Sequence, residues 1–532
     1  MDLISCRIKP YIQPFERQLA INELRALTSV EPTPIDGDYE SASVFVVPTL
    51  VDPNLLRSDL AYWESVGVQR PYLTAQLRGE ATSLIARNGV ALHALPQVVP
   101  DLVDVSIPKK RCLRYATHGL HEYRGKFFPQ LVRVFMNLIP LRDRAVVLDP
   151  LCGSGTTIVE AFLSGRRAYG LDLNPLSVFM SRVKTQALRL SERLYLSSFD
   201  KLSRVLHESQ GRNKTLRYFQ TMSEADQQYL SRWFAHSTLY ELDGIHDAIS
   251  ELPLTDIQDF YSVCLSNIIR GVSWQKEDDL RVRKEIVSLK DGEIVRRFLN
   301  EALRSTKMVV AFLAVSKAKR LGSYEVCQGD ARNVGTIWPE LLGRVDAVIT
   351  SPPYATALPY LDTDRLSLIY LGLLPRNEQR TLDGLMIGNR EITDRGRDLY
   401  WKQYEVNREL LPPKTRQLIE TIDGLNRGSK VGFRRRNLAV LLSKYFFDMR
   451  EVLQEQHALL RAKGTMFLVV GNNRTIAGGE PIEINTAEHL LTIAESLGFR
   501  LADDMSMEML VSRDIFRKNT MPSEQILILE KR

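Results

Sequence analysis

The chain has 532 residues, of which 44% are hydrophobic and 25% are charged, proportions that are typical of a globular protein. This length exceeds one ordinary hydrophobic core, so we expect one large domain with insertions or two to three domains. The 70 basic and 64 acidic residues leave a formal charge of +6, which permits nucleic acid as a partner without requiring it.

The cysteines and the apolar runs exclude several classes of protein. The five cysteines are scattered and never spaced as C-x-x-C, so neither a disulfide framework nor a cysteine metal site is predicted. The first residues lack the basic-then-apolar layout of a signal peptide, and no apolar run reaches the roughly 18 residues of a membrane span. We expect a cytoplasmic protein without a metal or a membrane anchor.

Residues 1–105 contain no chemical motif, and we assign them to an N-terminal accessory region of unknown role. Residues 95–110 contain several prolines, which predict a linker into the next unit.

A dense polar and aromatic cluster at residues 118–131 comes next. Pro129 suits the first turn of a helix, and polar and basic residues just before a helix can hold an anionic group. The alternative is a basic surface loop.

Residues 145–149 predict a buried strand that ends at Asp149 and leads through a glycine-rich turn into a helix. Gly153 and Gly155 allow close approach of a ligand to the start of that helix. The third glycine of a dinucleotide fingerprint would fall at Ile158, so a nicotinamide cofactor is disfavoured, and no P-loop motif is present.

A second strand at residues 168–173 contains Asp172, 23 positions after Asp149. An acidic side chain at this place commonly binds ribose hydroxyls. The alternative is a βαβ turn without a ligand. Residues 186–320 have helical periodicity, which predicts a helical insertion between the second and third strands. Most of its charged side chains are expected to face solvent.

Two more predicted strands each end in polar residues. Residues 324–331 end near Asp330, and residues 345–350 run into Ser351-Pro352-Pro353-Tyr354. Two consecutive prolines end the strand in a stiff turn. The alternative is a core strand that ends in prolines. Since ligands in open α/β sheets sit at the carboxyl ends of strands, we expect these groups to converge with Asp149 and Asp172.

The rest of the chain contains a basic insertion, at residues 376–437, and the end of the sheet. We expect a long helix at 438–463, a strand at 465–470 and a closing hairpin near 500–509 and 525–530. Basic residues beside an aromatic suit a nucleic-acid groove, although a basic loop is the alternative. The candidate nucleic-acid contacts are Arg427, Lys430, Arg434, Arg435 and Arg436 in the insertion, and Arg513, Arg517 and Lys518 in the hairpin loop.

Two of these motifs, residues 149–157 and Ser351-Pro352-Pro353-Tyr354, resemble the S-adenosylmethionine loop and the catalytic motif of amino-group (N4-cytosine or N6-adenine) DNA methyltransferases. The resemblance implies an α/β fold of class I methyltransferase (Rossmann-like) type, with a mostly parallel seven-stranded sheet, a reversed last strand and a helical insertion. It covers residues 106–185, 321–375 and 438–532 as three parts of the core. Residues 1–105, 186–320 and 376–437 lie outside it, so either insertion, or both, is a candidate target-recognition region.

The resemblance also implies roles for individual residues. Ser351, Pro352, Pro353 and Tyr354 would be catalytic. The residues implied to bind S-adenosyl-L-methionine are His121, Arg124, Lys126, Phe127, Pro129, Asp149, Pro150, Cys152, Gly153, Ser154, Gly155, Thr156, Thr157, Asp172, Asn174, Asp330 and Ala331.

In the implied reaction the Ser351 hydroxyl and the Pro352 carbonyl accept hydrogen bonds from the exocyclic amine of a flipped base. Tyr354 stacks on that base. A serine at the first motif position favours cytosine N4 within a restriction-modification or phage-defence system acting on double-stranded DNA, with any restriction or defence partner a separate protein. Methylation of an adenine N6, of an RNA base, and non-catalytic binding to nucleic acid are the alternatives.

Overall fold

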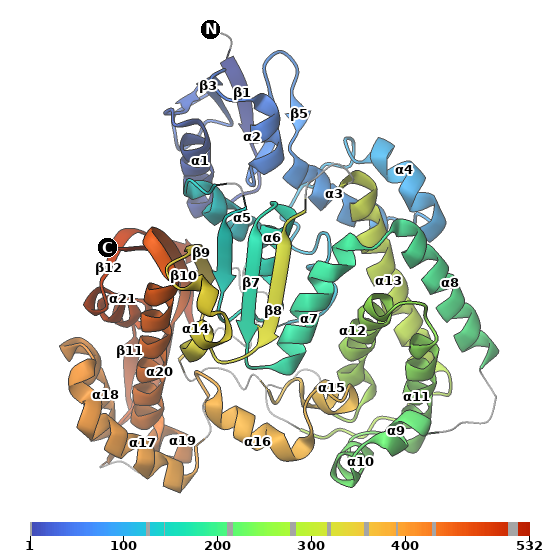
Figure 1. Cartoon of the computed structure of the whole chain (residues 1–532), viewed down its shortest axis with the longest axis vertical. Coiled ribbons are helices and arrows are strands. Elements are labelled where there is room, and N and C mark those ends of the chain that lie inside the picture. The colour runs from blue at the N-terminus through green and yellow to red at the C-terminus, as the bar shows by residue number, and fades with distance from the viewer. Residues whose placement is uncertain are drawn as a thin grey trace.

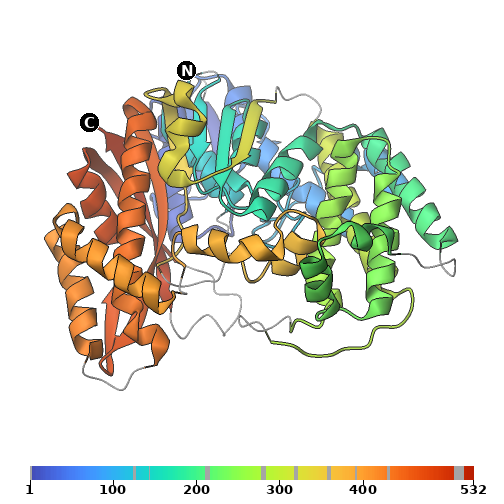
Figure 2. The same ribbon diagram turned by 60° about the horizontal axis from the view of Figure 1, so that its bottom comes forward.

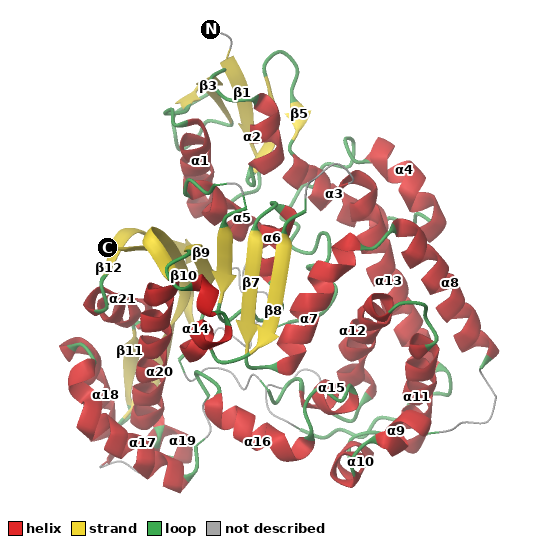
Figure 3. Cartoon of the chain, viewed as in Figure 1, coloured by secondary structure: helices red, strands yellow, loops and turns green. Residues whose placement is uncertain are grey.

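The structure is a computed structural model that describes residues 3–123, 128–142, 144–209, 216–276, 283–316, 321–355, 361–389, 392–427, 432–508 and 520–532. A β-sheet stands at the centre with helices against both of its faces (Figure 1). A smaller sheet near the N-terminus lies above it, and helices from the middle of the sequence lie to its right (Figure 3).

The central sheet has the strand order β12-β13-β10-β9-β6-β7-β8, with β11 paired to β10 alone. Strands β8, β7, β6, β9 and β10 are parallel, whereas β13 is antiparallel to both β10 and β12. The strands are β6 (Val146–Asp149), β7 (Arg167–Asp172), β8 (Ser323–Gln328), β9 (Val345–Thr350), β10 (Leu460–Ala477), β11 (Glu480–Ile484), β12 (Phe499–Glu508) and β13 (Thr520–Lys531).

The described residues thus form eight strands in this sheet, where the sequence predicted seven. The additional strand arises because β10 runs to Ala477, well beyond the predicted 465–470, and turns back as β11. Gly478 and Gly479 both have positive φ, which suits a tight hairpin turn.

Helices cover the sheet and form the two insertions. Those beside the sheet are α5 (Pro129–Leu138), α6 (Thr156–Leu163), α7 (Pro175–Gln186), α14 (Val334–Ile337), α20 (Leu438–Leu459) and α21 (Thr486–Ser496). Those within the two predicted insertions are α8 (Glu192–Glu208), α9 (Arg217–Thr221), α10 (Glu224–Ser231), α11 (His236–Ser250), α12 (Thr255–Val272), α13 (Glu293–Ser316), α16 (Arg376–Leu385), α17 (Asp394–Asn407), α18 (Pro413–Arg427) and α19 (Phe433–Arg436), and α15 (Arg365–Tyr370) comes just before the second of them. None of the described helices is both long enough and apolar enough to cross a membrane.

Successive side chains of the central strands enter two different cores. On β10, Met466 packs with α20 and α21, whereas Phe467 packs with α5, α6 and the N-terminal region. The rings of Phe467 and Phe135 stack with their centroids 4.5 Å apart. Side chains alternate between the faces of a strand, so both faces of this sheet are buried, as is usual for parallel strands.

The N-terminal region forms its own antiparallel sheet, in the order β2-β3-β1-β4-β5. A buried ion pair within this region, in which Lys9 Nζ lies 2.8 Å from Glu80 Oε1, also contacts the rest of the protein. Gln130 of α5 donates to the same oxygen at 3.0 Å. The elements are β1 (Leu3–Ile8), α1 (Pro14–Thr28), β2 (Thr33–Pro34), β3 (Val44–Pro48), α2 (Pro53–Asp59), β4 (Trp63–Gly67), β5 (Tyr72–Leu73), α3 (Ala75–Arg87) and α4 (Leu95–Leu102).

The linker predicted at residues 95–110 is wrong for its first half, which forms α4. Leu95 and Val99 are fully buried in the same hydrophobic cluster as α13. The prolines mislead because a proline in the first turn of a helix costs no hydrogen bond, and packing on α13 stabilises the rest.

The helical insertion shares its core with its neighbours. Residues of α8 to α13 form one cluster with α3, α4, α7 and α15. Because α7 follows directly from β7, this cluster connects the insertion to the edge of the sheet where the candidate site lies.

Candidate active site

The predicted site residues gather at the carboxyl edge of the central sheet. Strands β7, β6 and β9 are parallel neighbours and end at Asp172, Asp149 and Thr350. The sheet reverses its strand order between β6 and β9, which is where open α/β sheets bind ligands. Figure 2 brings this edge forward and shows α16 crossing beside it, between the C-terminal helices and the helical insertion.

The glycine-rich turn after β6 adopts the conformation that its sequence predicts. Gly153 and Gly155 have φ values of 48° and 83°, which cost glycine little. The Gly155 N–H donates to the Cys152 carbonyl at 2.8 Å, and Thr157 Oγ1 donates to the Ile349 carbonyl of β9 at 3.2 Å. The turn therefore joins the start of α6 to the strand that carries the Ser-Pro-Pro-Tyr motif.

Two buried carboxylates hold the turn. Asp172 accepts hydrogen bonds from the Gly153 N–H at 2.9 Å and the Asn174 N–H at 2.8 Å, one on each oxygen. Asp149 Oδ1 accepts from Thr350 Oγ1 at 2.7 Å. Burial raises the pKa of Asp149 and of Asp172 to about 6, although these hydrogen bonds act in the opposite direction.

The turn also presents a buried polar atom without a partner. Ser154 Oγ is buried and has no hydrogen bond among the described residues. A buried hydroxyl of this kind is uncommon in folded proteins. A methyl group added at Gly153 would lie 2.9 Å from the Tyr123 ring, so that ring covers the turn. Together these features form a small cradle whose backbone and hydroxyl groups suit a polar ligand.

We expect Gly155→Ala to lower the free energy of unfolding by about 1–3 kcal/mol and to weaken ligand binding at the turn. The added methyl would lie 2.3 Å from Ser181 Oγ and 2.8 Å from its Cα, at a left-handed φ. Urea denaturation measures the effect. Gly244→Ala in α11 is the control, because nothing lies within 4 Å of that position and alanine favours a helix. Equal stabilities of the two variants would contradict the prediction.

The Ser-Pro-Pro-Tyr motif lies across β10. Ser351 Oγ donates to the Val469 carbonyl at 2.9 Å, so its own lone pairs remain for accepting. The Tyr354 ring lies against Gly471, where an added methyl would be 2.6 Å from Cζ. The Tyr354 hydroxyl donates to Glu524 Oε1 of β13. The motif is thus fixed by strands that come more than 100 residues later.

The other predicted cofactor residues differ in their surroundings. His121 lies beside α12, with Nε2 3.0 Å from Ser266 Oγ and Nδ1 2.6 Å from the Glu122 carbonyl. Both nitrogens therefore have protein partners. Asp330 caps a short 3₁₀ turn that begins at the buried Ala331, and its carboxylate pairs with Arg332 at 2.5 Å.

Asn174 caps α7 through the Leu176 N–H, and Pro129 begins α5. Arg124, Lys126 and Phe127, for which the resemblance also implied a role in cofactor binding, lie outside the described residues.

No motif in the sequence predicted the buried cluster around Glu160 of α6. Glu160 Oε1 accepts from Tyr115 Oη at 2.5 Å and lies 2.8 Å from His118 Nε2. Its Oε2 accepts from Arg133 Nε at 3.0 Å and Nη2 at 2.9 Å. The cluster therefore fixes α5 and the segment before Tyr123 to the helix that follows the glycine-rich turn.

Four of the basic residues proposed for nucleic-acid contact lie in the described part of the chain, and all four are exposed. Arg434, Arg435 and Arg436 form α19, and Arg427 at the end of α18 pairs with Asp423 at 2.6 Å. Lys430, Arg513, Arg517 and Lys518 lie outside the described residues.

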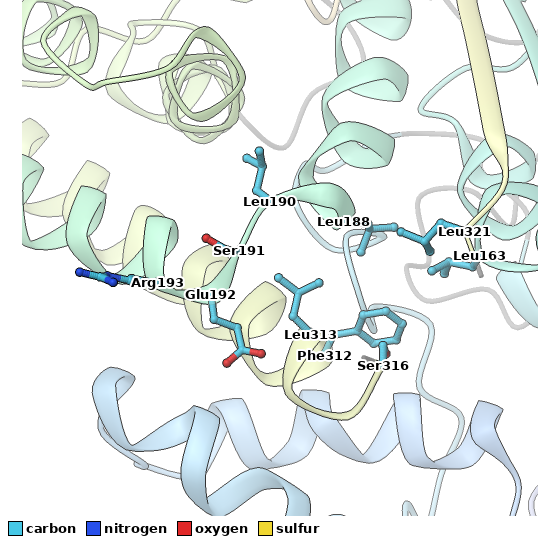
Figure 4. A pocket seen from close by; sticks show the side chains of 10 residues that line it. All are labelled: Leu163, Leu188, Leu190, Ser191, Glu192, Arg193, Phe312, Leu313, Ser316 and Leu321. Carbon is cyan, nitrogen blue, oxygen red and sulfur yellow. The ribbon is translucent and has the colours of Figure 1, made fainter. Parts of the chain in front are cut away.

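A cavity of about 430 Å³ lies away from this edge, between α13, the end of α6 and the segment that joins α7 to α8 (Figure 4). It is lined mainly by leucines and Phe312, near the amino ends of β7 and β8. The Ser-Pro-Pro-Tyr motif contributes nothing to it. Among the residues that the structure describes, no group of three histidine, cysteine, aspartate or glutamate side chains could hold a metal ion.

Comparisons with known proteins bear on this site. A family model described as an RMKL-like, methyltransferase domain (UPF0020) matches residues 120–232, which include the glycine-rich turn. The type II methyltransferase M.MvaI of Kocuria varians is 25% identical over 390 residues, covering 70% of this chain and 80% of the relative. These matches support an S-adenosylmethionine-dependent DNA methyltransferase family for this chain.

Two further matches of this methyltransferase are more distant. The type II methyltransferase M.MjaII of Methanocaldococcus jannaschii is 23% identical over 319 residues, which cover 46% of this chain and 60% of the relative. The solved structure of TrmN from Thermus thermophilus matches over 100% of both chains with 12% identity and a TM-score of 0.33. The mixed sheet of this methyltransferase, with helices on both faces, fits the class I methyltransferase architecture.

Proposed function

We propose that this methyltransferase methylates the exocyclic amine of a base that is flipped out of double-stranded DNA, at cytosine N4. The observation that carries the proposal is the hydrogen bond from Ser351 Oγ to the Val469 carbonyl. Because the hydroxyl proton is donated to that carbonyl, Ser351 Oγ can interact with a ligand only as a hydrogen-bond acceptor. An acceptor is what an amine N–H requires.

S-adenosylmethionine, when bound, supplies the electrophilic methyl group. The residues of this chain that suit it are Asp149, Asp172 and the turn from Gly153 to Thr157. Asp172 has a second lone-pair direction on each oxygen for ribose hydroxyls, and the unpartnered Ser154 hydroxyl can take a polar group of the methionine part. We assign the adenine end to Asp330 and Ala331, next to β8.

The base amine needs two acceptors. An amine attached to an aromatic ring is a poor nucleophile because its lone pair is delocalised. Hydrogen bonds from its N–H groups to Ser351 Oγ and the Pro352 carbonyl favour a pyramidal nitrogen whose lone pair points toward the methyl donor. Tyr354 stacks on the base, which must leave the duplex to reach this turn.

The choice of cytosine rests on the serine at position 351, since related motifs with aspartate or asparagine there more often modify adenine. Mass spectrometry of nucleosides from the DNA of expressing cells tests the proposal. We expect N4-methylcytosine in cells with the natural chain and far less of it in cells with Ser351→Ala. Detection of N6-methyladenine instead would show that the target is adenine and not cytosine. The absence of any modified DNA base would contradict the proposal.

Binding to DNA is assigned to exposed arginines. Arg434, Arg435 and Arg436 of α19 suit phosphate groups, as does Arg427. We assign the modification to a restriction-modification or phage-defence system in which a separate protein acts as nuclease.

Cofactor affinity is expected to fall roughly tenfold between pH 7.5 and pH 5.5. Burial raises the pKa of Asp149 and Asp172 to about 6, so both carboxylates take up protons across this range. A protonated carboxyl loses the negative charge that attracts the cationic sulfonium and ammonium groups. Calorimetric titration with S-adenosylmethionine measures the change, and constant affinity over this range would contradict it.

The stability of the ligand-free protein should change in the opposite direction. Both carboxyl groups bind protons more tightly in the folded protein than in the unfolded chain, because their folded pKa values are raised. The free energy of unfolding should therefore increase as the pH falls from about 6 to 4, because the folded protein takes up protons that the unfolded chain does not yet bind. Asp172→Asn removes one of the two groups and should flatten both pH dependences.

A further inference from the structure

The ring of Tyr354 occupies a place on β10 that a side chain would otherwise fill. A methyl group added at Gly471 would lie 2.6 Å from Cζ and 2.9 Å from both Cε atoms of Tyr354. These distances are far below van der Waals contact, so only glycine permits the ring to lie there. Gly471 is buried.

The residue opposite Gly471 binds the other end of the same ring. Gly471 and Glu524 are register partners in the β10–β13 pair, and Glu524 Oε1 accepts the hydrogen bond of the Tyr354 hydroxyl. Burial raises the pKa of Glu524, and the hydrogen bond from Tyr354 opposes this effect. A partly desolvated acceptor of this kind holds a phenol more firmly than water does.

The backbone around the ring is held as well. Asn473 Nδ2 donates to the Ala355 carbonyl at 2.6 Å, and Ser351 Oγ bonds to the Val469 carbonyl. Positions 469, 471 and 473 of β10 therefore each contact the segment from Ser351 to Ala355. The side chain of Tyr354 is the part of this segment that β10 alone does not fix, since its hydroxyl reaches β13.

We propose that Glu524 is a positioning residue that sets the plane of the Tyr354 ring against Gly471, and thereby the surface on which the extruded base stacks. The inference rests on the proposed function, in which Tyr354 receives that base. Glu524 touches neither the base nor the methyl donor; it acts through the Tyr354 hydroxyl alone.

A double-mutant cycle tests this role. Glu524→Leu should raise the KM for DNA about tenfold with a smaller change in kcat, because the Tyr354 ring loses the hydrogen bond that holds its plane. Glu524→Gln keeps an oxygen acceptor and should restore most of the affinity. In the Tyr354→Phe background, Glu524→Leu should have no further effect. An equal loss in both backgrounds would overturn the proposal.

The control is Glu530→Leu, on the same strand, where the carboxylate pairs with Arg500 at the surface. It should leave the KM for DNA unchanged. Urea denaturation of the same four proteins of the cycle reports the Tyr354–Glu524 contact without any assay of methyl transfer. Coupling in stability but not in KM would overturn the positioning role. Coupling in stability in a protein that modifies no DNA base would mean instead that the proposed function has failed.

Discussion

Ser351→Ala is expected to lower the rate of methyl transfer about 10²–10³-fold, the loss that follows removal of one polar group that stabilises a transition state. Ser351 Oγ gives its proton to the Val469 carbonyl, so alanine removes an acceptor from the base amine. The Pro352 carbonyl remains, and so does the ring of Tyr354. The effect should therefore fall on kcat more than on the KM for DNA.

Single-turnover transfer from radiolabelled S-adenosylmethionine to DNA measures this change. Affinity for the cofactor should stay the same, because the glycine-rich turn does not contact Ser351 in the hydrogen bonds described. Ser496→Ala is a matched control, since that hydroxyl bonds to the Ile493 carbonyl within α21. An unchanged rate for Ser351→Ala would remove the residue from the mechanism.

Glu160→Gln is expected to destabilise the protein by about 3–5 kcal/mol, the usual cost of leaving one charge of a buried pair without its partner. Glu160 and Arg133 are both almost fully buried. Burial by itself raises the pKa of Glu160, but the charge of Arg133 and the hydrogen bonds from His118 and Tyr115 outweigh it and bring the pKa to about 2.

The sign of the pH dependence follows from the lowered pKa. The contribution of Glu160 to stability is complete above its unfolded pKa near 4.5 and is lost as the pH falls toward 2. The difference between natural protein and variant in urea denaturation should therefore shrink below about pH 4.5. Glu293→Gln, which removes a surface carboxylate paired with Arg296 and Arg297, should change stability little. Equal effects of the two substitutions would contradict the prediction.

The same variant should weaken cofactor binding. Glu160 lies on α6, directly after the turn, and its partners Tyr115 and His118 belong to the segment that leads to Tyr123 over Gly153. Loss of the cluster frees that segment from α6. Cofactor affinity should therefore distinguish the two variants: it falls in Glu160→Gln and stays the same in Ser351→Ala.

Local patterns in the sequence were sufficient for the parts of the site that lie on consecutive residues. The glycine-rich turn follows from a short apolar strand and from Gly153 and Gly155, whose backbone angles are left-handed. Asp172 follows from its distance along the chain to Asp149, and the Ser-Pro-Pro-Tyr turn from the rigidity of proline. Each of these features is encoded within about 25 residues and needs no knowledge of the fold.

The N-terminal region and α4 show where such patterns fail. The short strands of residues 3–73 lack a motif, and the prolines near residue 100 resemble a linker, yet both pack into cores shared with α5 and α13. Local sequence reports propensity, whereas burial depends on which apolar faces meet. The boundaries of the three core segments and the roles of the two insertions remain predictions.

The sequence by itself determined the two motifs and the carboxylates that end β6 and β7, because strand ends, glycine turns and prolines act locally. The tertiary structure alone decided what surrounds Tyr354. Gly471 and Glu524 stand 117 and 170 positions after it, and they meet its ring because β10 pairs with β9 on one side and β13 on the other. Strand pairing between distant segments is a property of the whole sheet, and no local pattern in the chain encodes it.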